Sequence, residues 1–227
     1  MNKFAVILTC LTLLACGETN HTNSVKTISK IPSNTLSVEQ SDPKLIGKGD
    51  VEISILPGSI ARYLVNEQLA RKKLPNDAIG STNQVFGKII LTSEGTIKPG
   101  QSNIIVDLAS LRSDSSRRDE YIQKRTLETS IYPTTELLIN KISNLPWPLP
   151  NSGIHSFAII GDMTIHGITH RITWDVTAEF DLNSISGQAT TNFTFETFGM
   201  DIPRVFVVLS VTNNIRLEID FKAKISR

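Results

Sequence analysis

Cysteine is nearly absent from this chain of 227 residues. The two cysteines, Cys10 and Cys16, both lie close to the N-terminus. The rest of the chain therefore forms no disulfide, and cysteine nucleophiles and cysteine-ligated metal sites are excluded from it. An apolar core must stabilise the fold instead, and a chain with 40% hydrophobic residues can supply one.

The sequence also lacks an excess of charge of either sign, since 23 Lys and Arg residues oppose 22 Asp and Glu residues. Nucleic-acid binding requires clustered basic side chains that displace the counterions of the phosphates. The densest basic run, residues 117–125, is interrupted by Asp119 and Glu120. We therefore expect no nucleic-acid partner.

No apolar run is long enough to span a membrane, because a spanning helix needs about twenty residues. The longest early run, residues 4–14, follows Lys3 and precedes Ala15 and Cys16. A basic residue, a short apolar run and a small residue are the layout of an export signal. Residues 13–16, LLAC, further resemble the bacterial lipobox, in which the cysteine is acylated and the chain is cut just before it.

These features predict a lipoprotein signal peptide at residues 1–15 and a lipid on Cys16 that anchors the chain in the cell envelope. Gly17 follows the cysteine, where an aspartate would retain the protein in the inner membrane, so outer-membrane placement facing the periplasm is favoured. The alternative is an ordinary secretory signal with a chance cysteine. Residues 16–45 are predicted to form a flexible tether, because residues 17–44 contain twelve Ser, Thr or Asn and no aromatic residue.

The remaining residues, 46–227, alternate between apolar and polar positions. Residues 171–180 place Trp174, Val176 and Phe180 on one face and charged or hydroxyl side chains on the other, and residues 214–225 repeat the pattern. Further strands are predicted near residues 50–56, 60–66, 85–93, 103–110, 134–142, 155–166 and 188–197. Many strands with one apolar face indicate an antiparallel all-β fold, either a barrel or a sandwich.

Other segments are predicted to be helical or irregular. Residues 115–128 begin with Ser115, a capping residue, and predict one helix. Proline-containing residues 74–77 and 145–150 are predicted to be loops, because proline cannot donate to a sheet ladder. Ser186 and Gly187 are predicted to form a turn.

The histidines are the candidates for a catalytic or metal site. His166 and His170 are four residues apart, which on a helix would suit a metal ion. Gly167 between them predicts a hairpin turn instead, and His155 is isolated in the sequence. Because no nucleophile or paired carboxylates accompany them, we predict no catalytic residue, no metal site and no enzyme activity.

Four landmarks occur in order: Arg118-Asp119, residues 131–134 (IYPT), residues 161–169 (GDMTIHGIT) and residues 198–200 (FGM). Together they resemble the YceI-like family, a lipocalin-like group of exported bacterial proteins. The resemblance implies an antiparallel barrel of about eight strands with one short helix and an apolar tunnel for a polyisoprenoid, such as a polyprenyl phosphate or a quinone tail. The chain departs from the family at residues 63–68 and by an insertion at residues 69–81.

We expect the inward side chains to line this tunnel and to bind the lipid without any other cofactor, because each buried methylene contributes about 0.8 kcal/mol. The predicted lining residues are Val85, Ile104, Val106, Leu108, Leu137, Met163, Ile165, Ile172, Trp174, Val176, Ala178, Phe180, Phe193, Phe195, Leu217 and Ile219. The expected function is sequestration or transport of an isoprenoid-like lipid by an envelope lipoprotein. A scaffolding or adhesion barrel filled by side chains and a lipid-modifying enzyme are the alternatives.

Overall fold

The computed structural model describes residues 49–70, 73–204 and 208–227. The predicted signal peptide, Cys16 and the tether lie outside these residues. The elements in chain order are β1 (Val51–Ile55), β2 (Ile60–Leu69), β3 (Asn76–Thr82), β4 (Val85–Leu91), β5 (Asn103–Asp107), β6 (Arg112–Ser113), α1 (Ser116–Tyr121), the π-helical turn η1 (Ile122–Thr126), β7 (Thr134–Ser143), β8 (Gly153–Ile165), β9 (Ile168–Asp181), β10 (Ser184–Phe193), the 3₁₀ turn η2 (Phe195–Phe198) and β11 (Val208–Ser226).

Eight of these strands form a closed antiparallel barrel in the order β1-β4-β5-β7-β8-β9-β10-β11, with β11 pairing back to β1. This arrangement confirms the predicted all-β, lipocalin-like barrel. The ring of hydrogen bonds leaves no free sheet edge around the barrel.

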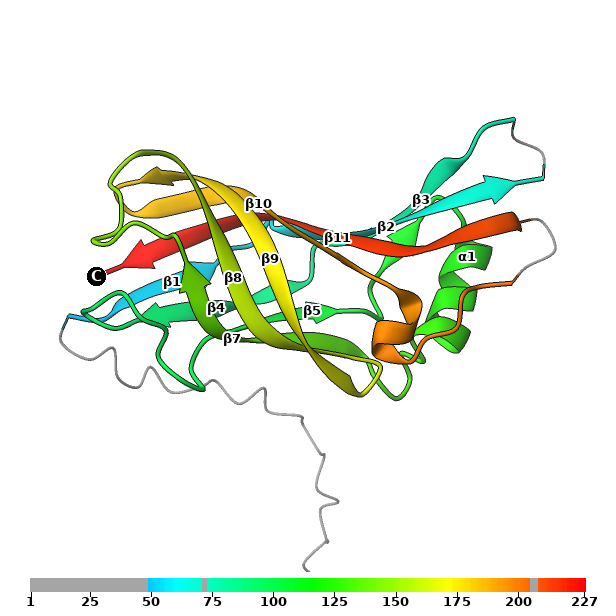
Figure 1. The fold of residues 1–227 in the computed structure, drawn as a ribbon, viewed down its shortest axis with the longest axis horizontal. Helices are drawn as coiled ribbons and strands as arrows, with labels where there is room; N and C mark the ends of the chain where they lie inside the picture. The colour runs from blue at the N-terminus through cyan, green and yellow to red at the C-terminus, as the bar shows by residue number, and fades with distance from the viewer. Residues whose placement is uncertain (1–48, 71–72, 205–207) are drawn as a thin grey trace, which may run out of the picture. The chain divides into compact units, whose positions relative to one another are not determined.

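The long strand β11 extends past the ring and carries a second set of strands. Its C-terminal part pairs with β1 and its N-terminal part pairs with β2, with register shifts between Val208 and Ser210 and between Val211 and Ile215. Strand β3 pairs with β2, and β6 pairs with β3. The β2–β3 hairpin, α1 and η2 therefore lie together at one end of the barrel (Figure 1).

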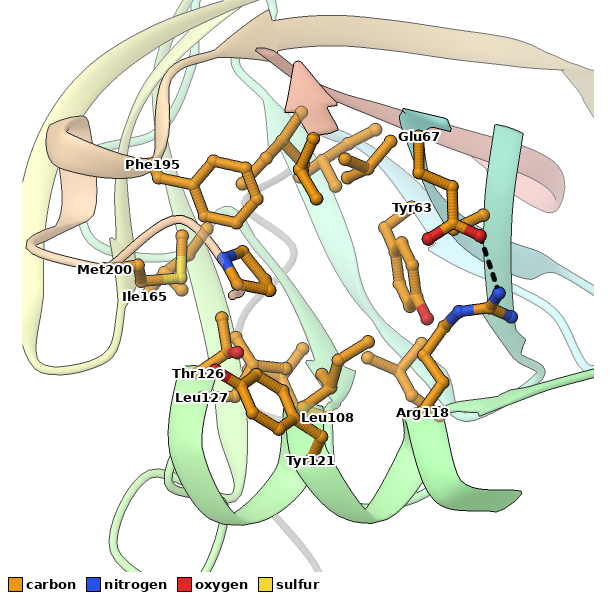
Figure 2. Close-up of a pocket in the computed structure, with 18 of the residues that line it drawn as sticks. Tyr63, Glu67, Leu108, Arg118, Tyr121, Thr126, Leu127, Ile165, Phe195 and Met200 are labelled. Carbon is orange, nitrogen blue, oxygen red and sulfur yellow. Dashed lines mark hydrogen bonds and ion pairs between the residues drawn. The ribbon is translucent and has the colours of Figure 1, made fainter. Parts of the chain in front are cut away.

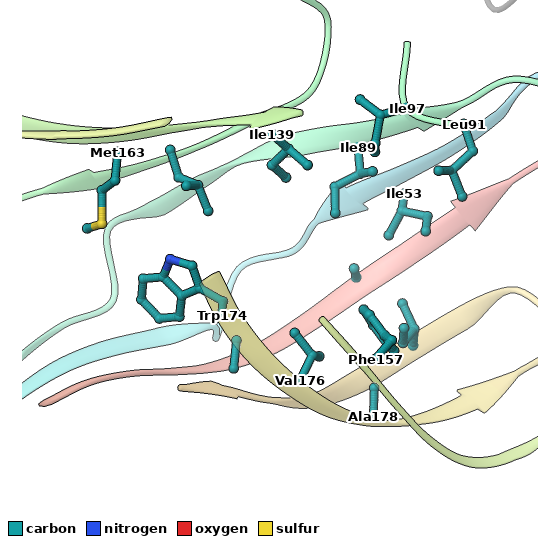
Figure 3. Packing of buried hydrophobic residues seen from close by; sticks show 14 of the residues in the cluster. Ile53, Ile89, Leu91, Ile97, Ile139, Phe157, Met163, Trp174, Val176 and Ala178 are labelled. Carbon is teal, nitrogen blue, oxygen red and sulfur yellow. The ribbon is translucent and has the colours of Figure 1, made fainter. Parts of the chain in front are cut away.

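The apolar core follows the alternation in the sequence. Trp174, Val176, Ala178 and Phe180 of β9 are each at most 3% exposed, while the residues between them are exposed. Figure 3 shows the indole of Trp174 and the neighbouring aliphatic side chains packed inside the barrel. The predicted half-wet strand is thus confirmed, and it supplies much of the core.

Some predicted boundaries differ from the structure. The predicted loop at residues 74–77 includes the first two residues of β3, Asn76 and Asp77, because Pro75 precedes β3 and removes no ladder donor from it. The inward residues of β3, Ala78, Gly80 and Thr82, are small or polar, so their alternation gives little apolar signal.

The predicted strand at residues 188–197 is displaced. Strand β10 begins at Ser184, and Phe195–Phe198 form a 3₁₀ turn. Gly187 lies within β10 and not in a turn. The position requires glycine because a Cβ atom there would overlap with the backbone of Thr177 and Ala178 on β9. This glycine marks a close approach of two strands.

The predicted helix is shorter than expected but begins where its capping residue stands. The side chain of Ser115 accepts a hydrogen bond from the backbone of Arg118, as an N-cap should. After Tyr121 the chain continues as η1, in which the amide of Leu127 donates to the carbonyl of Ile122 at 2.8 Å. No described helix is both long enough and apolar enough to cross a bilayer.

Candidate ligand-binding cavity

A cavity of about 400 Å³ lies at the end of the barrel that carries the helix. Strands β2, β3 and β11 form one wall, α1 and η1 form another, and η2 with the following residues forms a third (Figure 2). The lining is almost entirely apolar. Its main members are Tyr63, Val65, Ala78, Leu108, Leu111, Tyr121, Ile122, Leu127, Met163, Ile165, Phe193, Phe195, Met200, Val211, Ile215 and Leu217.

The helical wall is fixed to the barrel by its own polar groups. The Gln123 side chain donates hydrogen bonds to the carbonyls of Ala109 and Leu111 at 3.2 and 3.3 Å. The buried Thr126 ends η1 on the cavity side. Tyr121, Ile122 and Leu127 of the same segment line the cavity and present apolar surface to it.

One side of the cavity is charged. The Arg118 Nη2 atom donates to Glu67 Oε1 at 2.9 Å, and the two side chains are 19% and 7% exposed (Figure 2). Arg118 also pairs with Asp114, one turn earlier. Burial disfavours the charged guanidinium, but the hydrogen bond to Asp114 and the charge of Glu67 outweigh it and raise the pKa of Arg118 above its ordinary value. The cation is therefore permanent.

Tyr63 stands next to this ion pair, on β2. Its hydroxyl is buried and has no hydrogen-bond partner of good geometry among the described residues, although Ser113 is close by. Burial raises the pKa of Tyr63 to about 12, so the phenol is neutral at physiological pH. The ring occupies the space that a side chain at Gly80 would need. Glycine on β3 thus allows an aromatic ring to form part of the cavity wall.

Two smaller cavities follow the first one into the barrel. The middle cavity, about 70 Å³, shares Leu108, Met163 and Leu217 with the large cavity. The far cavity, about 60 Å³, shares Ile104, Leu137, Trp174 and Ile219 with the middle one. The sequence predicted one elongated tunnel, and the structure shows one large and two small apolar cavities whose linings overlap from each to the next.

The YceI-like domain model matches residues 69–223. The chain belongs to the YceI-like family. The match runs from the end of β2 to the C-terminal part of β11 and confirms the resemblance carried by the four landmarks. Among curated proteins, no sequence matches this chain.

Solved structures of YceI-like and related proteins share the fold at low sequence identity. The polyisoprenoid binding domain from Saccharophagus degradans implicated in plant cell wall breakdown has a TM-score of 0.57 and 9% identity, over 76% of this chain and 97% of that one. BcnA of Burkholderia cenocepacia has a TM-score of 0.53 and 12% identity, over 74% and 96%. The Campylobacter jejuni YceI protein has a TM-score of 0.50 and 16% identity, over 69% and 90%. At these identities the likeness concerns the fold.

The predicted lining residues of the YceI-like domain fall into three groups. Leu108, Met163, Ile165, Phe193, Phe195 and Leu217 line the large cavity. Ile104, Val106, Leu137, Trp174, Phe180 and Ile219 line only the smaller cavities. Val85, Val176 and Ala178 are buried, Ile172 is half-buried, and these four line none of the three cavities.

Sequence reasoning missed the residues that β2, β3, the helical segment and the chain after η2 bring to the cavity. The main ones are Tyr63, Glu67, Ala78, Arg117, Tyr121, Leu127 and Met200. The Arg118-Asp119 landmark indicated the right place, because Arg118 lines the cavity. Asp119 has a structural task instead, since it accepts hydrogen bonds from the backbone and hydroxyl of Ser113 at 2.9 and 2.6 Å.

In the YceI-like domain, His166 and His170 contact other side chains of the fold. His166 and Gly167 both have positive φ and form the predicted turn between β8 and β9, which is confirmed. The Nε2 atom of His166 lies 2.7 Å from Glu128, while His170 packs edge-on against Phe198. The described residues contain no cluster of three or more His, Cys, Asp or Glu that could bind a metal ion.

Proposed function

We propose that this protein is a non-enzymatic envelope lipoprotein that sequesters or carries an isoprenoid-like lipid in the barrel. The observation that carries the proposal is the apolar cavity of about 400 Å³, a size within the usual range for small-molecule sites. The fold likeness to the Saccharophagus degradans polyisoprenoid binding domain supports an isoprenoid rather than another apolar ligand. A branched, flexible chain suits a wall of Leu, Ile, Val and Phe because it needs no specific hydrogen bond.

Arg117 favours a prenyl phosphate over a quinone as the ligand. It lines the cavity, is exposed, and takes part in none of the ion pairs among the described residues, whereas its neighbour Arg118 already pairs with Glu67 and Asp114. A guanidinium without a carboxylate partner can donate two parallel hydrogen bonds to a phosphate. The head group would then lie beside Arg117 and the tail would lie in the apolar chamber.

The proposal is tested by native mass spectrometry of the full chain with farnesyl phosphate, farnesol and palmitate. We expect one farnesyl phosphate per chain, weaker uptake of farnesol, and the weakest uptake of palmitate. The Arg117→Met variant is expected to bind farnesyl phosphate no better than farnesol, with farnesol binding unchanged. A protein that takes up none of the three would exclude the carrier function and favour a scaffolding barrel.

The lipid anchor is a separate part of the proposal and predicts a change of location. Cys16→Ser removes the only thiol that could be acylated beyond the predicted cleavage point. We expect the variant to move from the membrane fraction to the soluble fraction and to lose lipoprotein-type processing, as measured by fractionation and by the mass of the mature chain. Cys10→Ser, inside the predicted signal, is the matched control and should leave both unchanged. Membrane retention of the Cys16→Ser protein would contradict the anchor.

A further inference from the structure

The helical wall of the large cavity and barrel strand β8 are joined by a pair of side chains that lies outside the cavity. The Nε2 atom of His166 lies 2.7 Å from Oε2 of Glu128. Leu127 precedes Glu128 after η1, Ile165 precedes His166 at the end of β8, and both apolar side chains line the cavity (Figure 2). Neither His166 nor Glu128 lines any of the three cavities. The pair therefore connects the two walls directly behind their lining residues.

Both members of the pair have a backbone conformation that few side chains adopt. The φ angle is 52° at His166 and 47° at Glu128, in the left-handed region. His166 and Gly167 form the turn between β8 and β9. The carbonyl of Glu128 accepts hydrogen bonds from the amides of Ile131 and Tyr132 at 2.8 and 3.0 Å, which makes a second turn. Such conformations are costly and persist only where the surrounding structure maintains them.

The two turns also pack against each other through Tyr132. Its ring meets the imidazole of His166 edge-on, with 5.0 Å between the ring centroids. A Cβ atom at Gly167 would lie only 2.8 Å from a ring carbon of Tyr132. Glycine at this position thus allows both the positive φ and the close approach of the two turns.

We propose that His166 and Glu128 are positioning residues whose contact holds the helical wall against β8 and thereby fixes the space between Leu127 and Ile165 for the ligand. Gln123 holds η1 to the backbone between β5 and β6, and the pair holds the chain just after η1. The inference rests on the proposed function and makes affinity depend on two side chains that do not touch the ligand. A wall that is ordered before binding costs less to order on binding, so loss of the contact weakens binding.

The experiment measures dissociation constants of the full chain for farnesol, whose neutral head group avoids any effect of Arg117. His166→Asn keeps a residue type that tolerates positive φ but has a shorter side chain, and Glu128→Leu removes the acceptor. Each should weaken binding about five- to ten-fold, the order of one hydrogen bond. The double variant should lose no more than either single variant, because both remove the same contact. Glu128→Gln keeps an acceptor oxygen and should restore most of the affinity.

The matched control is an ion pair on the same hairpin. Arg171 Nε lies 3.0 Å from Asp162 Oδ1 on the outer face of β8 and β9, and neither residue lines a cavity. Arg171→Leu should bind farnesol as the parent does. A purely structural role of the His166–Glu128 pair would lower Tm and leave the affinity of the folded protein unchanged. Parent-like affinity in folded His166→Asn or Glu128→Leu, or additive losses in the double variant, would overturn the inference while ligand binding stands.

Amide hydrogen exchange tests the connection between the walls without any ligand. The amide of Leu127 donates to the carbonyl of Ile122 at 2.8 Å, and that of Ile139 donates to Ser102 in the barrel at 2.9 Å. In His166→Asn and Glu128→Leu, the Leu127 amide should exchange about five-fold faster than in the parent, and the Ile139 amide should be unchanged. Unchanged exchange at Leu127 would show that the pair does not hold the wall. A parent that binds neither farnesol nor farnesyl phosphate would reject the proposed function and, with it, a role of the pair in binding.

Discussion

Replacing Ala78 by tryptophan is expected to lower the affinity for farnesyl phosphate at least a hundred-fold while the domain remains folded. Ala78 is 6% exposed, lies on β3 opposite Val65 and points into the large cavity. An indole at this position would occupy the space that the prenyl chain needs. Because the ring enters a cavity and not a packed core, we expect the loss of stability not to exceed about 1–3 kcal/mol, the usual range for overpacking a core.

The matched control for this variant is the next residue of the same strand. Ile79 is 43% exposed on the outer face of β3, so Ile79→Trp introduces the same side chain outside the cavity. Titration calorimetry should show parent-like binding for Ile79→Trp and no measurable binding for Ala78→Trp, and circular dichroism should show the same β-sheet content in both. Unchanged binding in a folded Ala78→Trp protein would mean that the ligand occupies another site.

The barrel could be predicted from sequence where one face of a strand meets water. Strand β9 alternates strictly because its outer face is solvated and its inner face is core, and the turn at Gly167 requires a residue that tolerates positive φ. Strand β3 could not be predicted in this way. Its inward positions hold Ala78, Gly80 and Thr82. Ala78 lines the cavity, and Gly80 leaves room for the ring of Tyr63.

The cavity was only partly predictable because it depends on contacts between distant segments. Met163, Ile165 and Phe193 lie on barrel strands, and their inward direction follows from alternation. Glu67 and Arg118 are 51 residues apart and meet only after β2 has paired with β11 and the helix has packed on the barrel end. No local pattern indicates such a pair, nor that Trp174 lines only the smaller cavities while Leu217 lines the large one as well.

Replacing Arg118 by methionine is expected to produce the largest loss of stability among the substitutions considered. The variant leaves the carboxylate of Glu67, 7% exposed, without the guanidinium that lies 2.9 Å from it. Removing one partner of a buried ion pair typically costs about 3–5 kcal/mol, and the 19% exposure of Arg118 places this pair near the lower value. For a domain of this size, a loss of about 3 kcal/mol lowers Tm by roughly 6–12 °C.

The double variant Glu67→Leu/Arg118→Met distinguishes a buried charge from a lost attraction. Replacing both partners by apolar side chains is often neutral, so we expect thermal unfolding to return to within about 1 kcal/mol of the parent. Lys124→Met is the surface control, because Lys124 and its partner Glu120 are 70% and 63% exposed and such exposed pairs contribute little to stability. If the double variant is as unstable as Arg118→Met, the cost arises from lost packing of the arginine stem and not from the uncompensated carboxylate.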